Sequence, residues 1–204
     1  MQTVIVALAA YFIGSTPFAV IVSRAMGLED PRKYGSGNPG ATNVLRSGSK
    51  KAAILTLIGD ALKGTVAVLL ARALAEPLGL TENDAAVAGI FAFLGHVFSV
   101  FLRFQGGKGV ATAAGVLLAM SPLAGGLTLA TWLLVAFTTR YSSAAALAAA
   151  MAAPVFTHIL VSGVSWTAAT IAMSAVLIWR HKDNISRLIA GKESRIGGKK
   201  KENV

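Results

Sequence analysis

Three short polar stretches carry the side chains that could do chemistry in an otherwise apolar chain. The first stretch reads GSGNPGATNVLR (35–46), the second FQGGKGVAT (104–112) and the third RHKDNISRLIAGKE (180–193). Glycine-rich loops with hydroxyl, amide and basic side chains suit anions, because their backbone N–H groups can face a ligand. Histidine adds a group that exchanges a proton near neutral pH. These stretches indicate chemistry on an anionic substrate, and phosphate fits their composition.

The first stretch resembles a dinucleotide-binding fingerprint in its letters only. Gly35, Gly37 and Gly40 have the GxGxxG spacing, but they follow the charged segment DPRK at 30–33 instead of a strand, so the βαβ context of the fingerprint is missing. We interpret the stretch as an anion-binding loop, with a flexible connector as the alternative. Its donor side chains are those of Ser36, Asn38, Thr42, Asn43 and Arg46.

The second stretch places Lys108 among glycines where a helix is expected to begin. A Walker A loop needs glycine six positions before the lysine and Ser or Thr directly after it, whereas Leu102 and Gly109 stand there. The stretch is no nucleotide loop, yet unblocked N–H groups of Gly106, Gly107 and Gly109 at the positive end of a helix dipole favour phosphate. The alternative is that Lys108 only marks the end of a helix.

The third stretch contains a histidine and an amide on one predicted helix face. His181 and Asn184 are three residues apart, so their side chains are neighbours on a helix. Ile185, Leu188 and Ile189 give the same segment an apolar side. A lone histidine at a membrane surface is usually solvated, and catalysis by His181 is the alternative.

The composition is that of a membrane protein. Of 204 residues, 54% are hydrophobic and 14% are charged, against about 25% charged in soluble domains, and the mean hydropathy is +0.64. The net charge of +10 would suggest nucleic acid in a soluble chain, but in a membrane chain it marks cytoplasmic loops. We therefore expect no nucleic-acid partner. The sequence has no cysteine, which excludes disulfides, thiolate catalysis and cysteine-bound metals.

Seven apolar segments are candidates for crossing a bilayer. They cover 3–22, 52–71, 85–102, 110–120, 123–137, 144–161 and 164–179. The segments 110–120 and 123–137 are shorter than the ~20 residues that one crossing needs. Ser121-Pro122 lies between them and favours a turn over one continuous helix.

The distribution of basic residues predicts the orientation. Of 19 Lys and Arg residues, 17 fall in four stretches: 24–51, 103–108, around Arg140 and the tail from Arg180. The connection 76–84 holds three acids and no base. The positive-inside rule places the basic stretches in the cytoplasm, so 110–137 has to cross twice. We expect an all-α integral membrane protein with seven transmembrane helices, some short, the N-terminus outside and the C-terminus cytoplasmic. It should form one domain over 1–204, with a basic tail at about 192–204.

Two opposite charges lie inside the second candidate span. Asp60 and Lys63 stand at i and i+3, and they should pair with each other or with the site, because unpaired charges in lipid are costly. His96 should reach the cytoplasmic third of its helix. His158 lies near the opposite surface, where we expect a structural role.

Together, the three stretches resemble the bacterial acyl-phosphate:glycerol-3-phosphate acyltransferases of the PlsY type. The resemblance covers nearly the whole chain and includes GSGNPGATN with Arg46, GHVFSVFLRFQGGKGVAT at 95–112 and RHKDNISRL with Glu193. It implies a seven-helix enzyme of the bacterial inner membrane with a cytoplasmic site. Such an enzyme moves an acyl chain from acyl phosphate to the 1-hydroxyl of glycerol 3-phosphate, which gives lysophosphatidic acid and phosphate in the first acylation of phospholipid synthesis. We expect membrane lipids around a monomer, without cofactor or metal.

The resemblance also implies roles for individual residues. The expected catalytic residues are Ser36, Lys108, Ser143, His181 and Asn184. The expected substrate-binding and phosphate-binding residues are Gly37, Asn38, Gly40, Thr42, Asn43, Arg46, Gly106, Gly107 and Gly109. The expected structural residues are Asp60, Lys63 and Glu193. Ser143 matches an active-site serine of the family better than Ser142 does, while a second family serine falls at Ala146.

The residues agree with acyl-phosphate chemistry. Acyl phosphate is a mixed anhydride with a good leaving group, so the catalyst mainly positions the substrates and stabilises charge. Either His181 or the donor phosphate can accept the proton. A transporter for a phosphorylated solute is the rival class, but the side of 76–84 offers no basic binding residue. A lipid-binding scaffold would leave His181 and Asn184 without a role.

Overall fold

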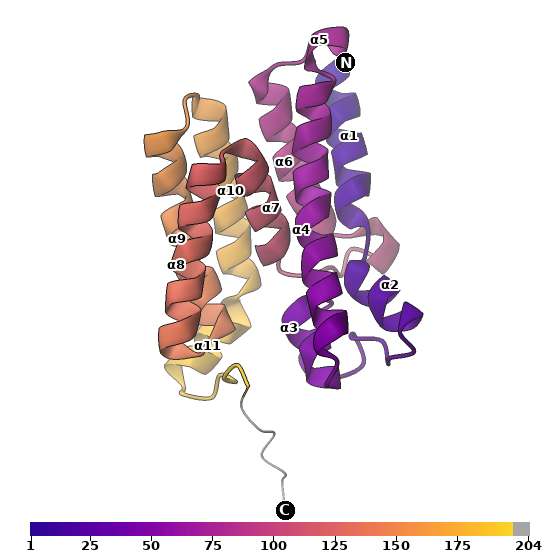
Figure 1. The fold of residues 1–204 in the computed structure, drawn as a ribbon, viewed down its shortest axis with the longest axis vertical. Helices are drawn as coiled ribbons and strands as arrows, with labels where there is room; N and C mark the ends of the chain where they lie inside the picture. The colour runs from indigo at the N-terminus through magenta and orange to yellow at the C-terminus, as the bar shows by residue number, and fades with distance from the viewer. Residues whose placement is uncertain (198–204) are drawn as a thin grey trace, which may run out of the picture.

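The computed structural model describes residues 1–197, and every regular element in that range is a helix (Figure 1). The elements are α1 Gln2–Ser15, α2 Phe18–Ala25, α3 Ala41–Val44, η1 Leu45–Ser47, α4 Lys50–Ala73, α5 Ala75–Leu78, α6 Glu82–Val97, η2 Val100–Leu102, α7 Val110–Met120, α8 Pro122–Thr139, α9 Ser142–Leu160, α10 Val164–Arg180 and α11 Lys182–Ile189. The predicted all-α class is confirmed.

Five helical segments are long and apolar enough to cross a membrane. They are Gln2–Ala25, Lys50–Ala73, Glu82–Leu102, Pro122–Thr139 and Ser142–Leu160. The helices α7 and α10 are apolar but shorter. The predicted apolar segments therefore lie mainly on helices, and the length of each helix supports a crossing for five of them.

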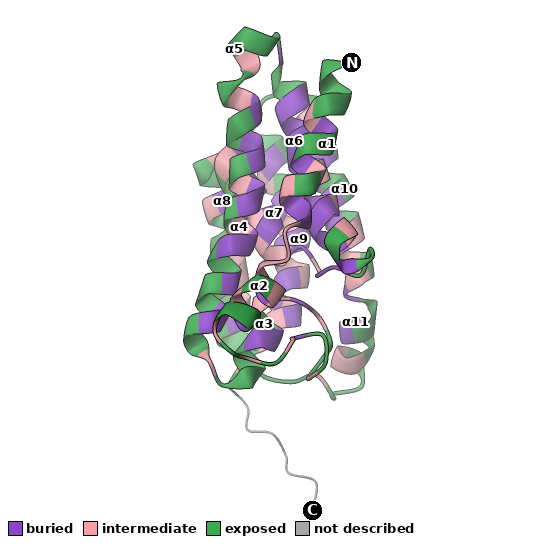
Figure 2. Ribbon diagram, turned by 90° about the vertical axis from the view of Figure 1, so that its right-hand side faces the viewer, coloured by how far each residue is buried: buried purple, intermediate pink, exposed green. Residues whose placement is uncertain are grey.

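The burial pattern is that of a bundle surrounded by lipid. Leu134, Phe137 and Ile159 are more than half exposed, whereas the buried residues face the inside of the bundle (Figure 2) and many of them are alanine. Small residues let helix backbones approach closely. At Gly14, for example, an added Cβ would lie 2.0 Å from the carbonyl oxygen of Ala92.

The first predicted span is broken, which differs from the single helix expected over 3–22. The helix α1 ends at Ser15 and α2 begins at Phe18, because Pro17 between them has no N–H to donate. The carbonyl of Thr16 at the break accepts a hydrogen bond of 2.9 Å from the Lys63 ammonium. A buried lysine thus satisfies the backbone group that the break frees.

The third predicted span also ends early, at Val97 instead of Leu102. The chain then turns back, and the N–H groups of Gly106 and Gly107 donate to the carbonyls of Val97 and His96 at 3.1 Å each. These bonds satisfy carbonyls at the end of α6 that no further helical turn reaches. The second polar stretch is therefore folded against the end of a helix.

The predicted turn between 110–120 and 123–137 is present. Ser121 lies between α7 and α8, its hydroxyl accepts a bond of 3.3 Å from the Ala124 N–H, and Pro122 is the first residue of α8. A serine cap followed by proline is a strong helix start. The two short apolar segments are therefore two helices that pack against each other.

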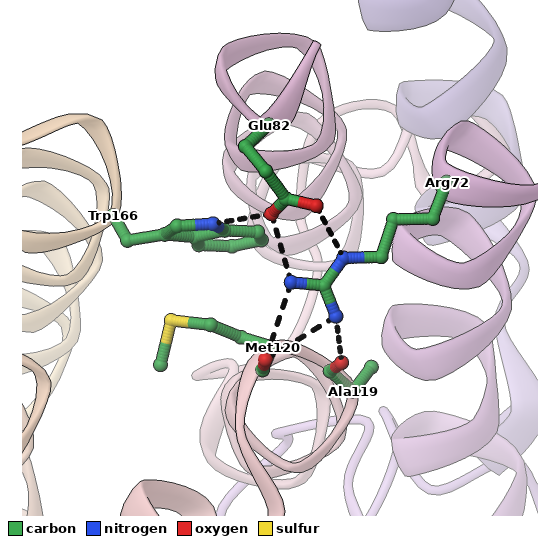
Figure 3. Close-up of polar contacts among 5 residues, drawn as sticks. All are labelled: Arg72, Glu82, Ala119, Met120 and Trp166. Carbon is green, nitrogen blue, oxygen red and sulfur yellow. Dashed lines mark hydrogen bonds and ion pairs between the residues drawn. The ribbon is translucent and has the colours of Figure 1, made fainter. Parts of the chain in front are cut away.

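Arg72 holds the end of the short helix α7 (Figure 3). Its guanidinium donates to the carbonyls of Ala119 at 2.6 Å and Met120 at 3.2 Å, and to the carboxylate of Glu82 at 2.8 and 3.0 Å. It also lies 5.6 Å from the ring centre of Trp166, and the Trp166 N–H donates to Glu82 at 2.9 Å. This basic residue, outside the four basic stretches, ties α4, α6, α7 and α10 together.

The two ends of the bundle carry different short helices. The N-terminus and α5 lie at one end, while α2, α3 and α11 lie at the other (Figure 1). The first and third polar stretches thus share one end, and the second lies in the connection between α6 and α7. The fold brings together segments that are far apart in the sequence.

Candidate active site

His181 stands between α10 and α11 with its imidazole buried. Its Nδ1 lies 2.8 Å from the carbonyl oxygen of Leu177; because a carbonyl only accepts, Nδ1 carries the proton and Nε2 is left as an acceptor. Burial lowers the pKa of His181 to about 4, and the positive charge of Lys108 also disfavours its protonation. The ring is therefore neutral at physiological pH.

Glu193 joins the third stretch to two other elements. Its carboxylate accepts hydrogen bonds from Asn184 at 2.6 Å, Ser143 at 2.8 Å and Arg187 at 2.7 Å. Burial raises the pKa of Glu193, but these bonds outweigh that effect and hold the pKa below its usual value. The ammonium of Lys108 donates to the other side of the Asn184 amide. A continuous polar chain thus runs from Lys108 through Asn184 to Glu193.

Lys108 is partly buried beside this chain. Burial lowers the pKa of its ammonium to about 8, and the positive charge of Arg187 acts in the same direction. The group therefore remains mostly charged at neutral pH and loses its charge in the mildly alkaline range. A cation with incomplete solvation is suited to bind a phosphate oxygen.

Two of the three glycines in the second stretch have N–H groups that are already hydrogen-bonded within the protein. The N–H groups of Gly106 and Gly107 were expected to be free for phosphate, but both donate to carbonyls at the end of α6. An added Cβ would lie 2.0 Å from the His96 carbonyl oxygen at Gly106, 2.2 Å from His96 Nε2 at Gly107 and 2.2 Å from Phe93 at Gly109. These glycines are needed because the loop packs tightly against α6, and Lys108 is left to contact the site.

The first stretch is shaped by the buried side chain of Asn43. Its amide oxygen accepts the N–H of Ser36 at 2.9 Å, and its amide nitrogen donates to the carbonyls of Pro31 at 2.6 Å and Tyr34 at 3.1 Å. Asn43 therefore holds the loop, and its hydrogen-bonding groups are used within it. Gly35 has φ of +61° and an added Cβ there would lie 2.3 Å from the Asn43 oxygen, so the turn requires glycine.

A polar pocket of about 260 Å³ lies between the first and third stretches. It is lined by Gly35, Ser36, Arg46, Arg187, Lys192 and Ser194. Arg46 donates to the Ser194 hydroxyl at 2.9 Å across it. Three cations around one pocket make it suitable for a phosphate group.

The structure brings most of the predicted site residues to this region, with differences among them. Thr42 contacts Ser142 at 3.4 Å, whereas Ser143 contacts Glu193, so the two serines face different partners. Asn38 is partly buried, with its N–H 3.5 Å from the Ser36 hydroxyl, and Gly37 and Gly40 lie in the same loop. The predicted ion pair of Asp60 and Lys63 is present at 2.9 Å, away from the pocket lining.

Sequence reasoning missed four residues. Arg187, Lys192 and Ser194 line the pocket, and Arg180 donates to the Gly106 carbonyl at 3.0 Å. Lys192 and Ser194 fall in the segment expected to be a solvated tail, of which 198–204 lie outside the described residues. The sequence could have indicated Arg187 as a site residue, because Arg187 follows Asn184 by three residues and so shares its helix face.

Comparison with known proteins identifies the family. A family model for glycerol-3-phosphate acyltransferase matches residues 4–191. Proteins named glycerol-3-phosphate acyltransferase from Ralstonia pickettii and Paraburkholderia phymatum are 64% identical over 202 residues and 63% identical over 201 residues. The alignments cover 98% of this chain in both cases, with 97% and 96% of the two relatives.

Two solved structures have the same fold. The crystal structure of PlsY (YgiH), an integral membrane glycerol 3-phosphate acyltransferase, in its glycerol 3-phosphate form has a TM-score of 0.88 at 36% identity, covering 97% of this chain and 96% of that one. Its lysophosphatidic acid form has a TM-score of 0.86 at 34% identity, covering 96% and 95%. The chain therefore belongs to the glycerol-3-phosphate acyltransferase family of integral membrane proteins, which confirms the family predicted from the three stretches.

The lowered pKa of Lys108 predicts an alkaline limit to activity. The ammonium loses its proton above about pH 8, and kcat/KM reports the ionisation of the free enzyme, so kcat/KM for acyl transfer to glycerol 3-phosphate should fall above that pH. Lys108→Arg keeps its charge to far higher pH, so its profile should remain flat there even if its rate is lower. The measurement is the initial rate at neutral and alkaline pH. An equal fall in both proteins would assign the limit to another group.

Proposed function

We propose that the protein transfers a fatty acyl group from acyl phosphate to the 1-hydroxyl of glycerol 3-phosphate. The products are lysophosphatidic acid and phosphate, and the reaction is the first acylation step of phospholipid synthesis. The observation that carries the proposal is the pocket of about 260 Å³ lined by Arg46, Arg187 and Lys192 beside the polar chain of Lys108. The printed descriptions of the related PlsY structures, a glycerol 3-phosphate form and a lysophosphatidic acid form, support it.

Two phosphate-bearing substrates need two groups of cations. We assign one phosphate to the pocket, where Ser36 and Arg46 of the first stretch face Arg187 and Lys192. We assign the other to Lys108, whose ammonium is fixed by Asn184. The remaining loop residues Gly37, Asn38, Gly40 and Thr42 would position the first substrate through the shape of the loop. Separate cations let both substrates bind at once, as direct transfer requires.

The transfer itself needs no protein nucleophile. The 1-hydroxyl oxygen of glycerol 3-phosphate attacks the acyl carbonyl carbon, a new C–O bond forms, and the bond between the acyl carbon and the phosphate oxygen breaks. Phosphate leaves with the electron pair, and Lys108 stabilises its charge. Cofactor and metal have no step in this scheme.

The hydroxyl proton goes to the donor phosphate in this proposal. Burial lowers the pKa of His181 to about 4, so its imidazole is a weak base, and we assign the proton to a phosphate oxygen of the donor, which lies beside the reacting carbon. The free Nε2 of His181 would accept a hydrogen bond and orient the attacking hydroxyl. Asn184 would hold the Lys108 ammonium in place, and Ser143 would hold the Glu193 carboxylate, through their hydrogen bonds.

We further propose seven crossings, with the N-terminus outside and the C-terminus and active site in the cytoplasm of a bacterial inner membrane. The site lies at the end of the bundle that carries α2, α3 and α11 (Figure 1), and 17 of 19 basic residues fall in the stretches assigned to the cytoplasm. The short helices α7 and α10 then complete the count. The proposed acting unit is a monomer.

Single cysteines test the orientation, because the natural sequence has none. Glu76 in α5 and Ser47 in η1 are both exposed and lie in connections assigned to opposite sides. In intact cells an impermeant thiol reagent should label Glu76→Cys and leave Ser47→Cys unlabelled until the membrane is opened. Labelling of Ser47→Cys from outside would contradict the seven-crossing topology.

Reconstitution tests the reaction. Purified protein in liposomes should convert acyl phosphate and glycerol 3-phosphate to lysophosphatidic acid, and EDTA should have no effect. Acyl-CoA in place of acyl phosphate should give little product. Equal turnover with acyl-CoA, or loss in EDTA that a divalent metal restores, would contradict the proposed donor and the absence of a metal.

The same assay separates the two roles of His181. If His181 only orients the substrate, His181→Ala should lower kcat/KM by about tenfold or less, as expected for one neutral hydrogen bond. A general base would contribute about 10²–10⁴ to kcat. His158→Ala, at an exposed position on α9, is the matched control and should keep wild-type kinetics.

A further inference from the structure

A buried ionic cluster lies next to the two glycine-rich loops. It has no part in the chemistry proposed above. Asp60 and Lys63 on α4 form an ion pair of 2.9 Å, and the Nδ1 of His96 on α6 lies 3.4 Å from the same Asp60 oxygen. All three side chains are buried. Buried charges in a membrane protein are expensive unless paired, so a cluster of this kind calls for a role.

The cluster is connected to both glycine-rich loops. A cavity of about 10 Å³, room for one water molecule, is lined by its three side chains together with Pro39 of the first stretch and Gly107 of the second. The cluster therefore shares a cavity with one residue of each loop.

His96 has three contacts that set the path of the second stretch. Its carbonyl accepts the N–H of Gly107 at 3.1 Å. Its ring lies so close to Gly107 that an added Cβ would be 2.2 Å from Nε2, and the three nearest atoms to that Cβ all belong to this ring. Asp60 contacts the opposite nitrogen of the ring. The residue after Gly107 is Lys108, whose ammonium contacts Asn184.

We propose that His96, held by Asp60, is a positioning residue for Lys108. The imidazole forms the surface on which Gly107 rests and so fixes where the Lys108 ammonium meets Asn184 and the substrate phosphate. Lys63 balances the Asp60 charge and binds the Thr16 carbonyl, which ties the cluster to the break between α1 and α2. The inference rests on the proposed function, because it concerns the phosphate-binding role of Lys108.

The test is a pair of substitutions that the structure predicts to compensate each other. Gly107→Ala should lower kcat/KM by about a hundredfold, since a shift of about 1 Å at a reacting group has that effect. His96→Ala should lower kcat/KM for acyl phosphate by roughly tenfold, with a loss in kcat, because a misplaced Lys108 stabilises the leaving phosphate less well. The double variant should recover to the level of His96→Ala alone, because the ring that meets the new Cβ is gone. His96→Asn keeps a donor near the Nδ1 position and should restore part of the loss.

Gly106→Ala is the matched control. Its added Cβ would meet the backbone carbonyl oxygens of His96 and Val97 at 2.0 and 2.7 Å, which remain in His96→Ala. Removing the imidazole should therefore not rescue Gly106→Ala. Equal rescue of both glycine variants, or wild-type KM and kcat in His96→Ala, would overturn the proposal.

A second double-mutant comparison, of His96→Ala with Lys108→Ala, covers the case in which Gly107→Ala does not fold. If His96 acts through Lys108, then His96→Ala should add little further loss in a Lys108→Ala background. A purely structural His96 would give the same proportional loss in both backgrounds and would overturn the proposal. Inactive wild-type protein would contradict the proposed function alone. In that case, the coupling between His96 and Lys108 is measured by calorimetric binding of inorganic phosphate to the same variants.

Discussion

The hydrogen bonds of the Glu193 carboxylate link the segments around the candidate active site. The carboxylate accepts hydrogen bonds from Ser143 on α9, from Asn184 and Arg187 on α11, and through Asn184 it is connected to Lys108 ahead of α7. These partners come from three separate segments of the chain, which are α9, α11 and the connection before α7. Because a buried carboxylate is stable only when its oxygens are satisfied, the segments are held together at the point where the pocket forms. The family acid expected to hold the structure therefore also orders the site.

A second polar cluster lies beside the two glycine-rich loops. Asp60, Lys63 and His96 satisfy one another, and the loop that follows α6 folds back over His96. The loop glycines have little freedom there, since close backbone approach excludes any side chain. Alanine is common in the bundle core, and the loop also lies against a large apolar side chain, since an added Cβ at Gly109 would be 2.2 Å from Phe93. Polar contacts link the segments in both places, around Glu193 and around Asp60.

The sequence predicted the helical class, the turn at Ser121-Pro122 and the pair of Asp60 with Lys63, because each has a local cause. The expected shared helix face of His181 and Asn184 stays a prediction, because His181 stands between α10 and α11 and contacts Leu177, whereas Asn184 contacts Glu193 and Lys108. The prediction of one helix over 3–22 overlooked Pro17, although proline is a local signal for a break. The early end of α6 could not be predicted, because it is stabilised by the distant glycines that return to it. For the same reason the bonded N–H groups of Gly106 and Gly107, and the part that Lys192 and Ser194 have in the pocket, were outside the reach of the sequence.

The most direct test of this account is the activity of Glu193→Gln. The amide keeps the shape of the side chain and removes the charge that Arg187 and Asn184 contact. Hydrogen bonds to a charged group contribute about 1.5–3 kcal/mol, so kcat/KM for lysophosphatidic acid formation should fall about ten- to a hundredfold. Glu29→Gln, at an exposed position outside the site, should keep wild-type activity. Wild-type kcat/KM in Glu193→Gln would contradict the claim that this carboxylate assembles the site.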